Sequence, residues 1–469
     1  MHLLFFITDA PVTTNSREII MHKPFLKVLL LQEARELLRK FGPRDVEGIP
    51  IEQGLFRVVS EPIKSSEDLP PFDRSTMDGF AVRCGDTFGA TEASPALLNV
   101  VGEAAMGEIS TLRLRTGQAV RIWTGGAIPA NADAVVMLEH SEDLGHDTIE
   151  ILKAVAPFDN VVRKGEDFKA GVTLLNTGHR LRPQDLGLLA SMGRTKVSVF
   201  KTVHVALISS GDEIVPIEQT PPPGCVRDVN RYTLTAGIIE THAMPVWIGI
   251  AADRVKDLSA RIAQGLTSAD LLLISGGSSM GSRDFVIEAI QAYEDSEILF
   301  HGVSVSPGKP LILARVGLHP VIGLPGHPAS AMICFEQFVV PLIRRLEGEN
   351  VVTPFLRPSL QAFLSRNVPS KEGRMDFVRV RLQVKDGRII ALPIPAKSGM
   401  ISGMVRADGY IRINEDCEGR YKGDLVTINL FSHWIEENIE KEYISGHENP
   451  GRSSGNFFQP APQEKLSKI

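Results

Sequence analysis

The chain reads Leu271-Leu-Leu-Ile-Ser-Gly-Gly-Ser-Ser-Met-Gly-Ser-Arg-Asp284 where a short apolar run stops at glycines and small hydroxyl residues and a helical pattern begins. A strand that passes into a helix through such a turn exposes backbone N–H groups that can bind an anion. A second stretch of the same kind is Val321-Ile-Gly-Leu-Pro-Gly-His-Pro-Ala-Ser330. Neither matches a Walker A or GxGxxG motif, so ordinary turn chemistry is the alternative. Two such turns together indicate a ligand that carries phosphate.

Four nearly continuous apolar runs predict buried parallel strands, and helical patterns such as 255–262 and 285–293 fall between them. The runs are Val205–Ser209, Pro245–Ile250, Leu271–Ser275 and Val321–Leu324. Strands that alternate with helices predict a doubly wound α/β domain, closed by a helix over 329–346. Ligands of such domains bind at the carboxyl ends of the strands.

Carboxylates follow three of these predicted strands. Asp212 and Glu213 come after the first strand, Asp253 after the second and Asp284 after the third. Because parallel strands end at one edge of a sheet, we expect these acids to converge on one rim. Helix N-capping is an equally good reading of Asp253 or Asp284 taken singly. Carboxylates would repel a phosphate bound at the neighbouring turns unless a cation lay between the two groups. A Mg²⁺ site follows as a hypothesis.

The remaining sequence predicts further domains. An amphipathic helix is expected over 25–41, a mainly β region over 51–152, and a second helical segment over 163–193 that includes a helix starting at Pro183. Short strands with Asp-Gly turns at 385–387 and 407–409 predict a small all-β domain. The tail after Gly446 is rich in Gly, Ser, Pro and Gln, which favours disorder.

Composition narrows the class of protein. The 469 residues carry a formal net charge of -6, which argues against a nucleic-acid binder. The 4 cysteines show no metal-binding or disulfide spacing, so we expect a reducing, cytoplasmic environment. Prolines interrupt the longest uncharged stretch, which excludes it as a membrane span.

Several segments, in this order, resemble the molybdopterin molybdenumtransferase family, to which the C-terminal half of gephyrin also belongs. They are Pro71-Phe-Asp-Arg-Ser-Thr-Met-Asp-Gly-Phe-Ala-Val82, Thr124-Gly-Gly-Ala-Ile-Pro129, Ala132-Asp-Ala-Val-Val136, Arg163-Lys-Gly-Glu-Asp167, Ser210-Gly-Asp-Glu213, Ser275-Gly-Gly-Ser-Ser-Met-Gly-Ser-Arg-Asp284, Pro307-Gly-Lys-Pro310 and Leu324-Pro-Gly-His-Pro-Ala-Ser330. The match runs from about Met21 to Leu430.

The resemblance implies an α/β plus β multidomain fold. Its expected parts are a split helical linker domain (21–70 and 160–200), an inserted β domain (71–159), a central doubly wound molybdopterin-binding α/β domain (201–349) and a C-terminal β-barrel (354–430), with 1–20 and 446–469 disordered. Family members insert molybdate into adenylylated molybdopterin with Mg²⁺ and release AMP. The resemblance also implies a homodimer, and as partners the preceding adenylyltransferase and acceptor apo-enzymes.

The resemblance also implies roles for individual residues. The critical acids would be Asp78, Asp167, Asp253 and Asp284, with Asp253 and Asp284 anchoring Mg²⁺. Thr124 and Glu213 would join them. The pterin and phosphate site would be shaped by Gly276, Gly277, Ser278, Pro325, Pro328 and Ser330. Lys309, Arg374 and Ser398 would contact the anionic groups. Asp78, Thr124 and Asp167 would complete a cleft formed by the α/β domain of a second copy.

One departure from the family pattern concerns the oxyanion. Gly302 and Ser306 occupy positions that are often basic in relatives, which should weaken attraction of molybdate unless Lys309, Arg374 or His301 compensates. Tungstate, with the same charge and a similar shape, is therefore an alternative substrate. A non-catalytic molybdopterin-binding scaffold and an ATP-dependent adenylylating enzyme are two further alternatives, and the intact acids disfavour the scaffold.

Overall fold

A computed structural model describes residues 28–277, 285–350 and 357–431. These residues form two compact units. The second unit contains residues 357–431 together with Ser304–Lys309 and His327–Ser330, and the first contains the other described residues. The predicted disordered ends, 1–20 and 446–469, and the predicted site residues Ser278 and Asp284 lie outside the described residues. The proposed domain limits stay predictions.

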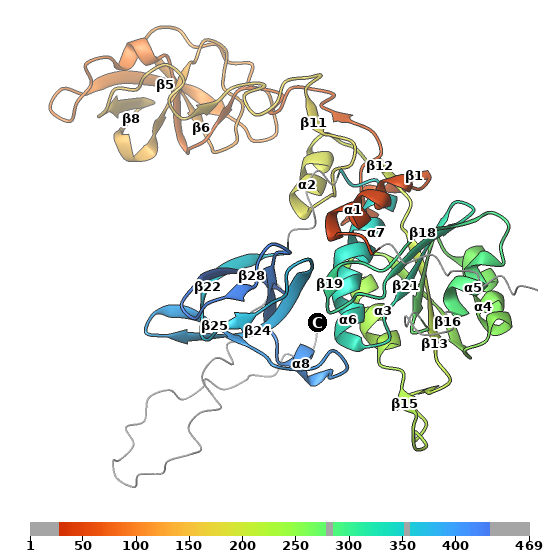
Figure 1. Cartoon of the computed structure of the whole chain (residues 1–469). Helices are drawn as coiled ribbons and strands as arrows, with labels where there is room; N and C mark the ends of the chain where they lie inside the picture. The colour runs from red at the N-terminus through yellow and green to blue at the C-terminus, as the bar shows by residue number, and fades with distance from the viewer. Residues whose placement is uncertain (1–27, 278–284, 351–356, 432–469) are drawn as a thin grey trace, which may run out of the picture. The chain divides into compact units, whose positions relative to one another are not determined.

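The first unit contains the predicted α/β sheet (Figure 1). Its strand order is β16-β13-β17-β21-β20-β18. The parallel strands are β16 (Met244–Ala251), β13 (His204–Ser210), β17 (Leu271–Ser275) and β21 (His319–Leu324). The strands β20 (Ile312–Val316) and β18 (Ser296–His301) pair antiparallel at one edge. The doubly wound fold is confirmed, but β20 runs against the other strands, which the sequence did not predict.

Helices cover both faces of this sheet (Figure 1). The helices α4 (Val255–Ser268) and α5 (Phe285–Gln291) pack with the apolar side chains of one face, and α3 (Asn230–Glu240) packs against β13 and β16. All five residues of β17 are buried, because helices cover both of its sides. This double burial explains why the strands read as continuous apolar runs.

The predicted helix over 329–346 is present but changes form in its middle. It runs as α6 (Pro328–Cys334), a π-helical segment (Phe335–Val339) and α7 (Val340–Leu346). Pro341 lies just after the π segment. Proline lacks an N–H group and clashes with the carbonyl one turn earlier, and a π segment accommodates such a disruption.

The inserted β region forms a mixed sheet of strand order β7-β4-β6-β5-β9-β8. The strands are β4 (Gly79–Val82), β5 (Ala96–Ala104), β6 (Gln118–Ile122), β7 (Ala134–Met137), β8 (Ser141–Gly145) and β9 (Thr148–Ile151). Alternating side chains of this sheet enter two apolar clusters, one centred on Phe80 and Val136 and the other on Ala81 and Val135. The mainly β prediction is confirmed here.

The flanking linker segments are less helical than predicted. Their described α-helices are α1 (Leu31–Glu36), continued by a 3-10 turn (Leu37–Lys40), and α2 (Pro183–Ser191). The remaining ordered segments are short antiparallel pairs: β1 (Val46–Pro50) with β12 (Lys196–Phe200), β2 (Ile63–Lys64) with β11 (Thr173–Leu175), and β3 (Arg74–Ser75) with β10 (Val161–Val162). The helical prediction for 163–182 was wrong, because glycines with positive φ at Gly165, Gly171 and Gly178 favour turns there.

The second unit contains a closed five-stranded barrel, as predicted. The ring is β24-β25-β22-β28-β26, closed by the pairing of β26 with β24. These strands are β22 (Ser359–Leu364), β24 (Met375–Lys385), β25 (Arg388–Pro393), β26 (Gly409–Ile413) and β28 (Leu425–Leu430). Asp386 and Gly387 form the predicted hairpin turn, both with positive φ.

The second Asp-Gly pair was misread as a turn. Gly409 begins β26, where an added Cβ would lie 2.3 Å from the carbonyl oxygen of Asn429. The preceding carboxylate, Asp408, accepts a hydrogen bond from the Leu382 N–H at 2.6 Å. The glycine is therefore required by close approach of two strands rather than by chain reversal.

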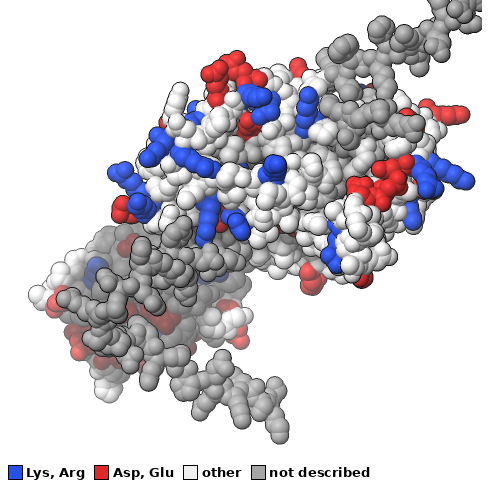
Figure 2. Space-filling model, turned by 60° about the horizontal axis from the view of Figure 1, so that its bottom comes forward, with Lys and Arg blue, Asp and Glu red and all other residues white. Residues whose placement is uncertain are grey.

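Two further findings concern helix length and surface charge. None of the helices in the described ranges combines the length and apolarity needed to cross a bilayer. Asp and Glu side chains lie among Lys and Arg side chains on the face shown in Figure 2.

We predict that Gly79→Ala destabilises the inserted sheet. An added Cβ would lie 1.9 Å from the Val136 carbonyl oxygen on the neighbouring strand, so the backbones must separate. The free energy of unfolding should fall by about 3 kcal/mol, measured by urea denaturation. Gly85→Ala is the matched control, because nothing lies within 4 Å of its added Cβ. Equal stability of the two variants would contradict the prediction.

Candidate functional site

The first predicted phosphate-binding turn follows β17 and consists of backbone held very close to its neighbours. Gly276 and Gly277 both have positive φ, 99° and 64°. A Cβ at Gly276 would lie 2.1 Å from the Ser210 carbonyl oxygen, and one at Gly277 would lie 2.9 Å from Val286 Cγ2. Only glycine fits at Gly276, so the tight turn is a requirement of the fold at this edge.

Two acids meet at the same edge of the sheet. The Ser210 hydroxyl donates to Asp253 Oδ1 at 2.8 Å, and the Asp253 N–H donates to Asp212 Oδ1 at 3.2 Å. The helix-cap alternative for Asp253 was wrong, since Arg254 occupies the N-cap position of α4. Glu213 is exposed, and its carboxylate lies beside Gly211, where an added Cβ would be 2.8 Å away. Of the acids expected to converge, Asp212 and Asp253 are thus in contact, while Asp284 lies outside the described residues.

A complete metal site is not visible among the described residues. No group of three or more His, Cys, Asp or Glu side chains in the described ranges is placed to hold a metal ion. Asp284, the second predicted Mg²⁺ ligand, lies outside those ranges, as does Ser278. The described chain therefore supplies Asp253 and Asp212 at this position. Mg²⁺ is often bound by one or two carboxylates, with water and phosphate completing the shell.

A residue that the sequence reading missed connects the two predicted turns. Asn230, the first residue of α3, donates from Nδ2 to Ser275 Oγ at 2.8 Å and to the Gly326 carbonyl oxygen at 2.8 Å. Its position at a helix start in Asp228-Val-Asn230 reads as ordinary capping chemistry in sequence. Only the fold brings the α3 start to the ends of β17 and β21.

The second turn has buried and exposed members. Pro325 and Ser330 are buried, Pro328 begins α6 and is half-buried, and Gly326 is exposed. Within the second unit, Ser398 Oγ lies 3.2 Å from His327 Nδ1, and the Ser398 carbonyl accepts from the Ala329 N–H at 3.1 Å. The structure therefore brings the predicted residue Ser398 to the Pro-Gly-His-Pro-Ala-Ser segment.

The predicted cations of the second unit lie on adjacent segments. β19 (Val305–Ser306) pairs with the start of β24, and exposed Lys309 follows it. Arg374 forms an ion pair with Asp376, with 2.9 Å between Nε and Oδ1. His301 is buried at the end of β18. Of the three residues considered as compensating cations, Lys309 is thus the exposed one, and Asp376 offsets the charge of Arg374.

The upstream motifs come together in one place. Backbone hydrogen bonds join the three motif segments: Ser75 N–H to the Gly126 carbonyl at 2.9 Å, and Gly165 N–H to the Pro70 carbonyl at 3.0 Å. The Asp73 carboxylate also accepts from the Lys164 N–H at 2.7 Å. Segments that are far apart in sequence therefore form one assembly of loops.

Asp78 and Thr124 are in direct contact in this assembly. Asp78 Oδ1 accepts from the Thr124 hydroxyl and from the Thr124 N–H, both at 2.7 Å. These two hydrogen bonds lower the pKa of Asp78. Asp167 is exposed, and its N–H donates to the Leu69 carbonyl at 3.0 Å. The pairing of Asp78 with Thr124 gives the resemblance-based choice of both residues a geometric basis.

We predict that Thr124→Val raises the pKa of Asp78, because the variant loses the hydroxyl that contributes most to lowering it. Thr124→Ser keeps a hydroxyl and should keep the lowered pKa. A carboxyl titration followed by NMR measures both. Protonation of Asp78 below its lowered pKa removes whatever stability the contact provides, so that contribution is lost as pH falls. An unchanged pKa in Thr124→Val would contradict the assignment.

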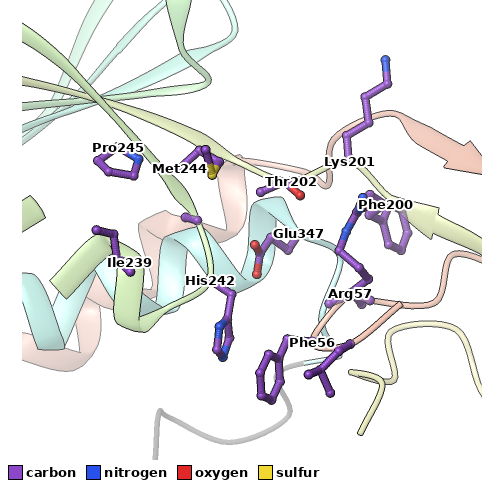
Figure 3. Close-up of a pocket in the computed structure, with 13 residues that line it drawn as sticks. Phe56, Arg57, Phe200, Lys201, Thr202, Ile239, His242, Met244, Pro245 and Glu347 are labelled. Carbon is purple, nitrogen blue, oxygen red and sulfur yellow. The ribbon is translucent and has the colours of Figure 1, made fainter. Parts of the chain in front are cut away.

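A cavity of about 500 Å³ lies away from the rim, beside Met244 at the amino end of β16 (Figure 3). The rings of Phe56 and His242 stack next to it with centroids 4.0 Å apart. Burial and the positive charges of Arg180 and Arg344 lower the pKa of His242. The sequence reading gave no sign of this cavity.

Comparison with known families agrees with this geometry. Residues 29–193 match the MoeA N-terminal region (domain I and II), residues 206–345 match a probable molybdopterin binding domain, and residues 361–431 match the MoeA C-terminal region (domain IV). The rim described above lies within the second match.

Individual relatives match over most of their length. The chain is 32% identical to the molybdopterin molybdenumtransferase of Bacillus subtilis, covering 82% of this chain and 90% of the relative. It is 30% identical to the enzyme of that name from Haemophilus influenzae, covering 87% and 100%. The crystal structure of a molybdopterin biosynthesis MoeA protein from Pyrococcus horikoshii has a TM-score of 0.73 at 30% identity, covering 86% of this chain and 100% of that chain. The chain belongs to the MoeA family of molybdopterin molybdenumtransferases.

Proposed function

We propose that this protein inserts molybdate into adenylylated molybdopterin, with Mg²⁺ and with release of AMP. The observation that carries the proposal is the rim where the glycine turn after β17 lies beside the Ser210, Asp253 and Asp212 group. Glycines leave backbone N–H groups accessible to phosphate oxygens, and carboxylates beside them need a cation. The nearness of the glycine turn to these carboxylates supports the proposal of a phosphate and metal site here.

Asp253 and Asp212 are the described residues that would hold Mg²⁺. Asp253 uses Oδ1 to accept from Ser210, and Asp212 uses Oδ1 to accept from the Asp253 N–H. Each carboxylate therefore has a second oxygen to offer, and Asp284 is the further ligand that we propose. When bound there, Mg²⁺ would neutralise charge on the phosphates of the ligand. The serine and the backbone hold Asp253 in one orientation, which is what a metal ligand requires.

The oxyanion would be held by residues of the second unit. Lys309 is exposed, and Ser398 contacts the turn that contains Pro325, Pro328 and Ser330. Because Asp376 offsets Arg374, and Gly302 and Ser306 carry no charge, the positive potential here is modest. Tungstate stays a second candidate substrate, since it has the same charge and a similar shape and its insertion would need the same groups.

Asp78, Thr124 and Asp167 would act on the same reaction from a second copy of the chain. We propose a homodimer in which this loop assembly completes the rim of the partner. The direct contact of Asp78 with Thr124 supports a common role. An adenylyltransferase would supply the substrate, and acceptor apo-enzymes would take the product. Cys84 and Cys334 are buried thiols, which is compatible with a cytoplasmic location.

The test mixes purified protein with adenylylated molybdopterin, Mg²⁺ and molybdate and measures AMP. We predict that Asp253→Asn lowers AMP release at least about a hundredfold, since several kcal/mol of charge stabilisation are lost. Asp257→Asn, in the first turn of helix α4, which follows Asp253, is the matched control and should keep the wild-type rate.

The outcomes separate the alternatives. Wild-type protein that binds the ligand but releases no more AMP than Asp253→Asn would identify a scaffold and overturn the proposal. Consumption of ATP with free molybdopterin would instead identify the adenylylating enzyme. A faster reaction with tungstate than with molybdate would establish the second candidate substrate.

A further inference from the structure

Asn230 joins the two glycine turns through one amide group. Its Nδ2 donates to Ser275 Oγ, which immediately precedes the first turn, and to the carbonyl of Gly326 within the second. The turns also touch directly, since a Cβ at Gly326 would lie 3.6 Å from Gly276 Cα. A backbone bond from the Gly276 N–H to the Leu324 carbonyl, at 3.1 Å, is a further connection.

The orientation of the Asn230 amide follows from these partners. The Gly326 carbonyl can only accept, so the atom facing it must be the NH₂ group. The Asn230 carbonyl oxygen therefore points elsewhere, and it has no hydrogen-bond partner among the residues that the structure describes. Asn230 is only 7% exposed. A buried acceptor in this state is costly unless something pairs with it.

Other buried polar atoms lie on the same side of the sheet. Ser209 pairs in register with Ser275, so their side chains share the face that α3 covers. Ser209 Oγ and Asp228 Oδ2 also lack partners within the described ranges, although both residues are buried. Native proteins rarely leave such a group of polar atoms unpaired away from a ligand or ordered water.

We propose that Asn230 is a positioning residue that holds the turns after β17 and β21 as one ligand-binding element. Its two hydrogen bonds fix the separation of the turns, so that groups of one ligand can engage both at once. The identity of that ligand, adenylylated molybdopterin, rests on the proposed function. The structural coupling of the turns does not.

Two substitutions test the coupling. Asn230→Ala removes the whole amide, and Asn230→Asp keeps its shape but removes the NH₂ donor. Both should speed hydrogen exchange of the Gly276 amide about tenfold, which corresponds to ~1.4 kcal/mol. Both should also raise the KM for adenylylated molybdopterin about tenfold, with a smaller change in kcat, because the groups that react are untouched.

The matched control is Asn429→Ala in the barrel. Asn429 is also a buried asparagine, and its Nδ2 donates to the Tyr410 carbonyl at 3.5 Å. This variant should leave exchange at Gly276 and the KM unchanged. Suppose instead that hydrogen exchange becomes faster throughout β13, β17 and β21, and that thermal stability falls to the same extent as the exchange indicates. Asn230 would then be merely structural, and the proposal would be overturned. The proposal would also be overturned if hydrogen exchange at Gly276 did not change. The same holds if Asn230→Ala speeds this exchange and Asn230→Asp does not. Wild-type protein that releases no AMP, with exchange raised at Gly276 alone in the variants, would refute the proposed function and leave the coupling intact.

Discussion

The close packing of Gly276 against the Ser210 carbonyl is the constraint on which the rest of the site depends. Any side chain at this position would enter the backbone of the neighbouring strand, because an added Cβ would lie only 2.1 Å from that oxygen. The contact brings the ends of β13 and β17 together and leaves the turn as bare backbone. The backbone of Ser210 is held by its contact with Gly276, and its hydroxyl donates a hydrogen bond to Asp253.

The proposed site would allow an acidic protein to bind a phosphate-bearing ligand. The charge of -6 gives no general attraction for anions. The rim instead combines backbone donors with two carboxylates whose charge a Mg²⁺ ion would balance. Asn230 extends the same element to the second turn, so that two loops from separate strands behave as one surface.

The sequence predicted the α/β domain well, because strands that are buried on both faces appear in it as continuous apolar runs. The apolar run 271–275 is β17 without any change of limits, and Asp212 and Asp253 meet as strand polarity requires. The antiparallel strand β20 and the edge strand β18 beside it were missed, since an apolar run does not reveal the direction of a strand. The linker was misread because its glycines mark turns between short strands paired over long sequence separations.

Side-chain contacts between distant segments could not be predicted from one sequence alone. In the sequence, Asn230 looks like an ordinary residue at the start of a helix. In the structure, its side chain donates hydrogen bonds to both Ser275 and Gly326. Family resemblance selected Asp78 and Thr124 as site residues, but their contact appears only in the structure, because spacing alone gives no reason to pair them. The cavity beside Phe56 and His242 likewise forms from segments that carry no common motif.

A crystal structure of the protein with adenylylated molybdopterin and Mg²⁺ tests the central claim most directly. The account predicts phosphate oxygens within hydrogen-bonding distance of the Gly276 and Gly277 N–H groups and Mg²⁺ on the Asp253 carboxylate. A ligand bound in the cavity beside Phe56 and His242, with the rim left empty, would contradict it.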